Sequence, residues 1–227
     1  MHSIHLYIIN QILKIMKTIT ILIAILIATS VTTFAGSYEE TMSKTIVQLY
    51  QTQSSEELIT LGNTFDRIAQ KEADKWLPYY YAAYANLSVL FFSQNLSSDE
   101  KNSILDKAQQ ELNQALKLNE RESEIYVLQA FIYQMRITNA SQGYKYSTLS
   151  NEALAKAKTL NPENPRYYYL KGTNVFYTPT EFGGGEKAAK PFFKKAEALF
   201  SKDKHENTLM PIWGKQHNSM MLQQCNK

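Results

Sequence analysis

Apolar side chains recur along most of the chain at intervals of three and four residues, the spacing that places them on one face of an α-helix. Leu58, Leu61 and Phe65 share such a face, and residues 104–116 repeat the pattern with isoleucine, leucine and alanine. Residues 36–227 contain no alternating apolar and polar run bounded by turns, which is the pattern of a half-buried strand. The chain is therefore predicted to be all-α.

Two helix starts are marked by side chains that cap free backbone amides. Ser54 precedes Glu57, and Ser97 precedes Glu100, by the three residues of a capping box. In this motif the hydroxyl and the carboxylate each accept a hydrogen bond from a backbone N–H at the helix start. We therefore expect helices to start directly after Ser54 and Ser97.

Internal repeats distinguish a stacked array of helices from an arbitrary bundle. Three segments place a tyrosine four residues before a small residue: Tyr81–Ala85, Tyr126–Ala130 and Tyr168–Gly172. Three others carry a small residue, a large apolar residue four later and an alanine three after that: Ala108–Ala115, Ser150–Ala157 and Ala189–Ala196. The last alanine of one unit precedes the small residue that ends the next tyrosine segment by 15 residues both times, from Ala115 to Ala130 and from Ala157 to Gly172. Within a unit, the interval from that small residue to the last alanine falls from 30 to 27 to 24 residues. Because a packing joint tolerates fewer length changes than a loop, the sequence predicts three stacked antiparallel helix pairs.

These spacings resemble the tetratricopeptide repeat, in which a proline follows the last alanine of the unit. Here Pro162 follows Ala157 by five residues. The units are longer than the usual repeat, at 42 to 45 residues between aligned tyrosines. Four stretches are similar to small secreted tetratricopeptide proteins of Bacteroidetes, a group without an assigned activity: WLPYYYAAYA, LNPENPRYYYLKG, YTPTEFGGG and PIWGKQHNSMMLQQC. The resemblance implies an α-solenoid of about three repeats plus flanking helices, with a concave groove lined by the first helix of each pair.

Residues 1–35 have the features of a secretory signal peptide. They contain Lys14 and Lys17, no acidic residue, and an apolar run that is followed by Thr33-Phe34-Ala35. We expect cleavage after Ala35 and an exported product, either periplasmic or secreted, with translation starting at Met1 or at Met16. An uncleaved N-terminal anchor is the alternative. The expected order continues with a degenerate helix pair (36–76), three repeats (77–203) and a C-terminal capping segment (204–227).

Charge and reactive side chains exclude several classes of function. Without residues 1–35 the chain has 22 basic and 21 acidic residues, so we expect neither nucleic acid nor a membrane surface as partner. His205 and His217 lack metal-site spacing and are interpreted as surface residues. Cys225 lies at the end of the chain, and the glycines at 183–185 lack the spacing of a phosphate-binding loop. We expect no catalytic site, no metal and no cofactor.

Tyrosine is the unusual residue, with 15 in the chain and triplets at 79–81 and 167–169. Consecutive helical residues point about 100° apart, so one ring of a triplet faces the core and its neighbours reach another surface. The resemblance places that surface along the groove. The candidate binding residues are Tyr79, Asn86, Phe131, Gln134, Arg166, Tyr169, Thr173, Phe176 and Tyr177.

Two kinds of partner fit this groove. The first is a protein or an extended peptide that lies along the concave face. The alternative is a small molecule, as for the repeat-containing accessory proteins of some periplasmic solute transporters, held in a closed apolar pocket among Tyr79, Phe131, Tyr169 and Phe176. A third interpretation is purely structural, with the tyrosines packed against the C-terminal segment that contains Trp213.

Overall fold

The computed structural model describes residues 38–203 and 209–226, so the expected signal peptide and His205 lie outside the described residues. The chain divides into two compact units, residues 1–41 and 42–227. In the first, residues 38–41 are described, and they are helical. Throughout the described ranges the regular elements are helices, which confirms the all-α class. None of the described helices is long and apolar enough to span a membrane.

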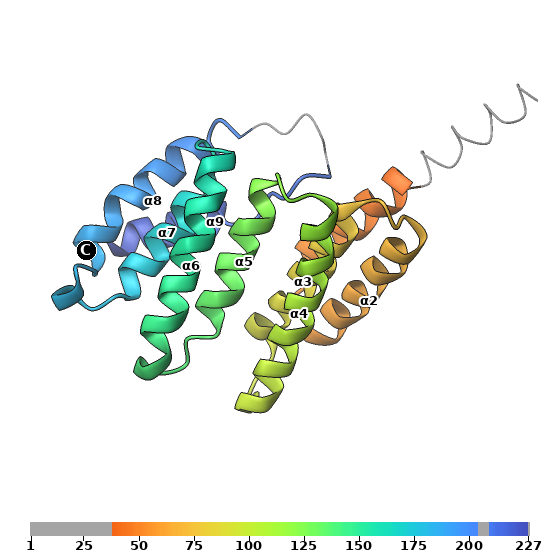
Figure 1. The fold of residues 1–227 in the computed structure, drawn as a ribbon, viewed down its shortest axis with the longest axis horizontal. Coiled ribbons are helices and arrows are strands. Elements are labelled where there is room, and N and C mark those ends of the chain that lie inside the picture. Colours follow the sequence, from red (N-terminus) through yellow and green to blue (C-terminus); the bar gives the residue numbers. More distant parts are fainter. Residues whose placement is uncertain (1–37, 204–208, 227) are drawn as a thin grey trace, which may run out of the picture. The chain divides into compact units, whose positions relative to one another are not determined.

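The second unit begins with helical residues 42–51 and continues with the helices of Figure 1. These are α2 (Ser55–Lys71), α3 (Trp76–Phe92), α4 (Ser98–Leu118), α5 (Ser123–Met135), α6 (Ala140–Leu160), α7 (Pro165–Tyr177), the short 3-10 helix η1 (Thr180–Phe182), α8 (Glu186–Phe200) and α9 (Lys215–Gln224). The helix starts predicted after Ser54 and Ser97 are confirmed, because both hydroxyls accept a backbone hydrogen bond there and Glu100 completes a capping box.

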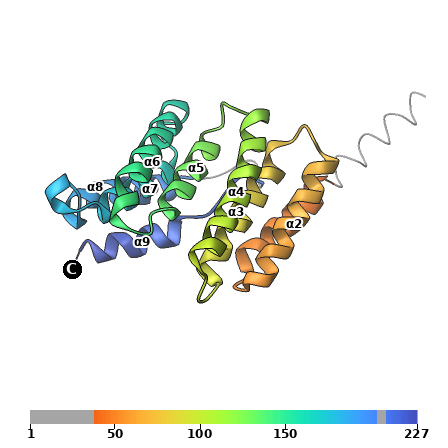
Figure 2. The ribbon, with the colours of Figure 1, turned by 60° about the horizontal axis from the view of Figure 1, so that its bottom comes forward.

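Successive helices pack as antiparallel pairs, α3 with α4, α5 with α6 and α7 with α8 (Figures 1 and 2). The pairs stack because α5 contacts α3 and α4 of the pair before it, and α7 contacts α5 and α6. The helix α9 packs against α8 and α7. The predicted stack of antiparallel helix pairs is therefore confirmed, with its three pairs spanning residues 76–200.

The small residues of the repeat pattern lie in the core. Ala115, Ala130 and Ala157 are fully buried, and Gly172 is buried in α7. A Cβ atom at Gly172 would lie 2.7 Å from the ring of Phe193, which is also fully buried. The sequence interval assigned Gly172 to the joint between pairs, but its close contact is with α8 of its own pair. Its missing side chain lets the Phe193 ring approach the α7 backbone.

The three glycines form the turn between α7 and α8. Thr178 ends α7 with an extended backbone, and Gly183, at a φ of 81°, ends η1. The residue that ends α7 is therefore Thr178, and the glycines belong to the turn that follows it. The N–H of Gly184 donates to Pro179 O, and a Cβ atom there would collide with Thr178 O at 2.0 Å. These glycines are required by the tight turn.

We predict that Gly172→Ala lowers the free energy of unfolding by about 1–3 kcal/mol, because the new methyl group overpacks the Phe193 ring. Urea unfolding followed by circular dichroism measures the change. The matched control is Gly143→Ala in α6, where nothing lies within 4 Å of the new Cβ atom. That control is expected to hold or raise stability, because alanine is the better helix former. Equal effects of the two substitutions would contradict the packing argument.

Candidate ligand-binding pocket

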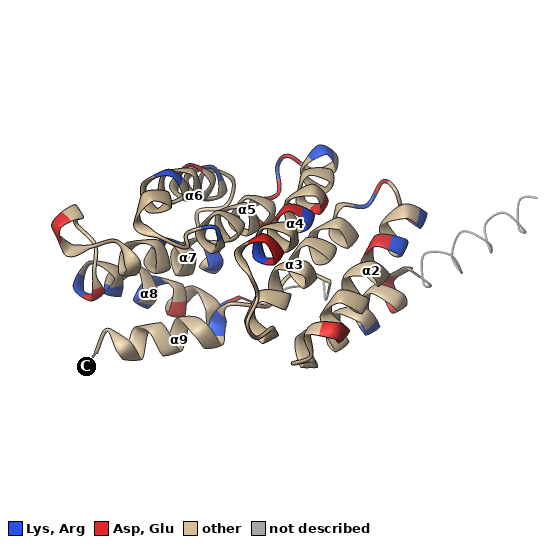
Figure 3. Cartoon of the chain, turned by 90° about the horizontal axis from the view of Figure 1, so that it is seen from below, with Lys and Arg blue, Asp and Glu red and all other residues tan. Residues whose placement is uncertain are grey.

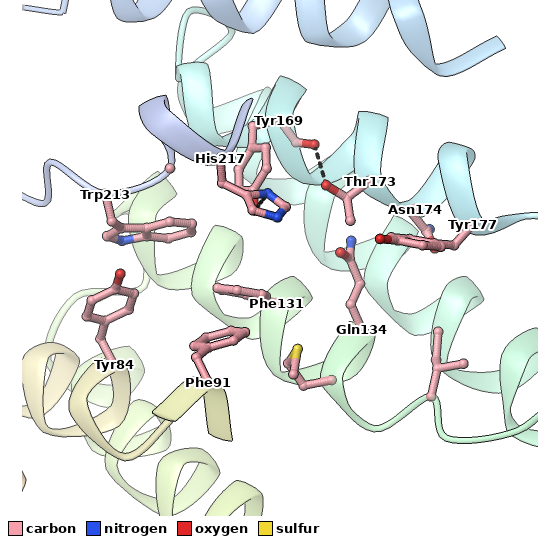
Figure 4. A pocket seen from close by; sticks show the side chains of 13 residues that line it. Tyr84, Phe91, Phe131, Gln134, Tyr169, Thr173, Asn174, Tyr177, Trp213 and His217 are labelled. Atoms are coloured by element: carbon pink, nitrogen blue, oxygen red, sulfur yellow. Dashed lines mark hydrogen bonds between the residues drawn. The ribbon is translucent and has the colours of Figure 1, made fainter. Parts of the chain in front are cut away.

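A partly open pocket of about 580 Å³ lies where α3, α5 and α7 meet the C-terminal segment (Figure 4). This volume is within the range of sites that hold small organic ligands. Its lining is mostly aromatic or apolar and contains no Lys, Arg, Asp or Glu. The lining residues are Tyr84, Phe91, Phe131, Gln134, Met135, Ile137, Tyr169, Thr173, Asn174, Tyr177, Trp213, Gly214 and His217.

Four stacked rings form one side of the pocket, which we call the aromatic wall: Phe91, Phe131, Trp213 and Tyr84. Phe131 stacks on Phe91 at 5.9 Å and on Trp213 at 5.4 Å between ring centroids. Trp213 in turn stacks on Tyr84 at 5.4 Å. The wall joins α3, α5 and the C-terminal segment, and Phe91 at its end is 51% exposed. Such a surface is suited to a flat, apolar ligand.

The position of Trp213 in this wall is fixed by polar contacts. Its indole N–H donates to the hydroxyl of Tyr80 over 2.8 Å. The hydroxyl of Tyr81 donates to the backbone carbonyl of Leu209 over 2.7 Å, which holds the chain shortly before the indole. Burial raises the pKa of both tyrosines above the ordinary value, so the hydroxyls stay protonated. These contacts hold the Trp213 indole in place in the pocket lining.

A buried ion pair supports the same segment. The Arg166 Nε–H contacts both carboxylate oxygens of Glu124, at 2.9 and 2.8 Å, and the two side chains are 1% and 5% exposed. Asn164 donates to Glu124 as well, and Arg166 Nη1 donates to the Trp213 carbonyl over 3.3 Å. Arg166 was predicted to line the groove, but it is buried and lies outside the pocket lining. Its role in the structure is to hold Trp213.

Tyr169 and His217 meet at the pocket. The Tyr169 hydroxyl lies 2.8 Å from His217 Nδ1, and the two rings make an edge contact. Partial burial lowers the pKa of His217 below its ordinary value, so the imidazole is neutral at pH 7. Burial raises the pKa of Tyr169, which therefore stays a phenol. The sequence predicted that His217 lies at the surface, and its side chain is exposed. The sequence did not indicate that this side chain also lines the pocket.

The other end of the pocket is polar and uncharged. Gln134 Nε2 donates to Ser150 Oγ at 3.0 Å and to Leu170 O at 2.9 Å. Its Oε1 is buried and, within the described part of the chain, has no hydrogen-bond partner. Figure 4 shows this amide beside Thr173 and Tyr177 at the pocket. A buried acceptor without a partner costs free energy, so a ligand with a donor at this point gains a contact.

The structure brings five of the nine candidate residues together around the pocket: Phe131, Gln134, Tyr169, Thr173 and Tyr177. The other four lie outside the lining. Asn86 is buried and donates to Ala82 O, Phe176 packs on Phe193, Tyr79 is partly exposed, and Arg166 is the buried cation described above.

The analysis of repeats missed eight lining residues: Tyr84, Phe91, Met135, Ile137, Asn174, Trp213, Gly214 and His217. The sequence interpretation in which the tyrosines pack against the segment with Trp213 could have found Tyr84 and Trp213. Tyr80, Tyr84 and Tyr169 do contact Trp213.

Figure 3 marks the positions of the Lys, Arg, Asp and Glu residues along the helices. The start of α9 carries a cation, because exposed Lys215 follows the lining residue Gly214 directly. Among the described residues no group of three or more His, Cys, Asp or Glu side chains is placed to hold a metal ion. The lining therefore offers stacking and hydrogen bonding to a ligand, and Arg136 and Lys215 are direct sequence neighbours of lining residues.

Comparison with solved structures gives an informative match. No protein-family model matches the chain, and no curated protein sequence matches it either. Among solved structures, the chain is similar to the HusA haemophore from Porphyromonas gingivalis, with a TM-score of 0.74 and 30% sequence identity. The match covers 83% of this chain and 92% of that chain. The tetratricopeptide assignment itself stays a prediction.

We predict that Glu124→Gln lowers the free energy of unfolding by up to about 3–5 kcal/mol, because the buried Arg166 guanidinium loses the carboxylate charge at its Nε and keeps only the longer ion pair with Asp203, at 3.5 Å, among those described. Urea unfolding at pH 7 measures the loss. Asp106→Asn is the matched control, since it removes the partner of Arg136 in an ion pair whose carboxylate is 63% exposed. It is expected to cost under about 1 kcal/mol. Similar small losses in both variants would show that the buried pair has no special weight.

Proposed function

We propose, from the premise that this chain belongs to the family of the HusA haemophore, that it is an exported protein that binds haem in the pocket beside Trp213. The single observation that carries the proposal is the aromatic wall within a pocket of about 580 Å³. Haem is a flat, largely apolar macrocycle with two carboxylates on one edge, and each of these features has a counterpart in the pocket.

The apolar face of the macrocycle pairs with the aromatic wall. Phe131 lies in the middle of the stack, between Phe91 and Trp213, so a flat ligand on this wall contacts rings from α3, α5 and the C-terminal segment. Aromatic side chains give a large buried area with specific geometry, which is where most of the binding free energy of such a ligand arises. Phe91, at 51% exposure, is the ring with the most surface left to cover.

The carboxylate edge has two kinds of neighbour. Thr173 and Tyr177 supply hydroxyl groups at the polar end. Lys215 at the start of α9 is exposed and follows the lining residue Gly214 in sequence, which makes it the candidate cation for a carboxylate. A single exposed ion pair contributes little, about 0–1 kcal/mol. The carboxylates are therefore expected to set the orientation of haem, while stacking supplies most of the affinity.

The geometry favours a small ligand over an extended peptide. Trp213 packs on Tyr84 of α3, Phe131 of α5 and Tyr169 of α7, so the C-terminal segment covers part of the face on which a peptide would lie. What stays accessible is a pocket rather than a continuous groove. Binding of a protein or peptide partner stays a prediction from the repeat resemblance.

The remaining elements of the proposal concern location and chemistry. A haem carrier is useful outside the cytoplasm, which agrees with the secretory signal expected in residues 1–35. We propose that the protein is periplasmic or released. We also propose that it is not an enzyme, because a carrier binds its ligand without changing it.

We predict that the purified chain without residues 1–35 binds haem saturably, and that Phe131→Ala weakens binding about tenfold. The loss of one stacked ring costs about 1–2 kcal/mol, which corresponds to that factor. Absorbance titration with haem at pH 7 measures both affinities. Tyr144→Ala is the control, because Tyr144 is 86% exposed and absent from the lining. Equal affinities for the Phe131 and Tyr144 variants, or no saturable binding by the wild type, would refute the proposal.

A further inference from the structure

We propose that His217 is a specificity-determining residue of the pocket, which donates a hydrogen bond from its Nε2–H to a carboxylate of the bound macrocycle. The inference rests on the proposed function and adds to it the side chain that selects a ligand by its acidic edge. It is carried by three observations: the donors that the lining has already used, the contact that holds the imidazole at Nδ1, and the anchoring of the helix that carries His217.

The first observation is that several polar side chains of the lining have used their donors inside the protein. The Gln134 amide nitrogen donates to two neighbouring acceptors, at 3.0 and 2.9 Å. The Thr173 hydroxyl donates over 3.0 Å to the backbone carbonyl one turn earlier in α7. The indole N–H of Trp213 is held by Tyr80. These groups can donate to a ligand only by giving up a bond within the protein.

Two tyrosines of the lining are poorly placed to recognise an acidic edge. Tyr84 stacks on Trp213 as part of the aromatic wall, where it meets the face of a flat ligand. Tyr177 is 71% exposed, so its hydroxyl exchanges one hydrogen bond to water for one to the ligand and gains little. His217 therefore offers the donor that is both at the pocket and not yet used.

The second observation concerns the tautomer of His217. The Tyr169 side chain is buried and burial raises its pKa, so its hydroxyl keeps the proton and needs an acceptor. Its partner is His217 Nδ1, at 2.8 Å. A neutral imidazole that accepts at Nδ1 carries its proton on Nε2. A carboxylate at Nε2 favours the same tautomer, so Tyr169 and the ligand support each other through the ring.

The Nε2 side of the imidazole is accessible from the pocket. Among the described residues the hydrogen bond of His217 is the one at Nδ1, and the side chain is exposed. Figure 4 shows the ring against Tyr169 with its other edge toward the open space between Phe131 and Gln134. A flat ligand on the aromatic wall therefore brings its edge within reach of Nε2.

The third observation is that His217 stands on an anchored helix. The neighbouring Asn218 is fully buried, and its side chain donates to Phe193 O at 3.1 Å and to Glu197 Oε2 at 3.0 Å. Gly214 precedes α9 at a φ of 97°, and a Cβ atom there would lie 3.3 Å from the Tyr169 ring. The start of α9 is thus close against α7, which fixes the direction of His217.

The surroundings of His217 suit a carboxylate. The lining contains no Asp or Glu that would repel an anion, and exposed Lys215 lies two residues earlier on the same helix. A hydrogen bond to an ionised acceptor is about twice as strong as one between neutral groups. Stacking on the aromatic wall does not distinguish one edge of a flat ring from another, so His217 supplies the preference for the acidic edge.

The test compares iron protoporphyrin, which has two free carboxylates, with its dimethyl ester, in which both are blocked. Each is titrated at pH 7, in one buffer, into the wild type and His217→Phe, with absorbance as the readout. His217→Phe keeps a flat ring against Tyr169 and removes both nitrogens. We expect it to weaken binding of the free acid about tenfold and binding of the ester less than twofold.

Two further variants separate hydrogen bonding from packing. His217→Gln places an amide N–H near the former Nε2 position, so it is expected to bind the free acid within threefold of the wild type. Gln216→Ala is the matched control, because Gln216 is an exposed neighbour on α9 outside the lining, and it is expected to leave both affinities unchanged. Circular dichroism spectra of the variants check that each is folded.

The outcomes distinguish this inference from the proposed function. If iron protoporphyrin binds the wild type and His217→Phe leaves its affinity unchanged, or weakens acid and ester equally, the carboxylate contact is refuted and the haem pocket stands. Equal affinities of the wild type for acid and ester would refute it as well. If neither macrocycle binds the wild type, the proposed function fails and the inference fails with it.

Discussion

The Glu124 carboxylate and the Arg166 guanidinium are almost completely removed from water, and the shape of the pocket depends on how that cost is offset. Removing two charges from water costs several kcal/mol for each ion, and their attraction repays it only when the remaining donors and acceptors are also satisfied. Asn164 supplies a donor to the carboxylate, and the Trp213 carbonyl supplies an acceptor to the guanidinium. The C-terminal segment thus completes a network that begins between α5 and α7. Because Trp213 is tied to this network, its indole is a fixed surface of the pocket.

The tyrosine triplet at residues 79–81 shows how the covering segment changes an ordinary repeat. Side chains a residue apart cannot all face one core, yet Tyr80 and Tyr81 are both fully buried. Tyr81 stacks on Phe65 of α2, whereas Tyr80 accepts the hydrogen bond of the Trp213 indole on another side of α3. The second surface of α3 has become interior because the C-terminal segment lies on it. Tyr79, which contacts neither partner in this way, is the ring left partly exposed.

Local signals in the sequence predicted the parts of the structure that depend on local contacts. Helical spacing and the caps at Ser54 and Ser97 act within a few residues, and the constant interval between repeats reflects neighbouring pairs. The same register placed Phe131 and Gln134 on the face that lines the pocket. Contacts between distant segments leave no periodic pattern, so the pairing of Arg166 with Glu124, and the return of Trp213 to Tyr84, could not be read in advance. A buried arginine and a groove arginine look alike in a helical register.

The C-terminal segment with Trp213 packs on α3, α5 and α7, the first helices of the three pairs, and so limits the size and shape of a ligand that fits there. A bare stack of helix pairs presents a long groove, whose many shallow contacts suit an extended chain. Here the segment with Trp213 shortens that groove to a pocket of about 580 Å³, a space that suits a small ligand with a few contacts. The lining offers stacked rings, the unpaired Gln134 Oε1 and the imidazole of His217, and none of these is charged at pH 7. A flat macrocycle uses the rings over its whole face, whereas a small ion or a sugar would leave them uncovered, and this is the physical reason to connect the pocket with haem.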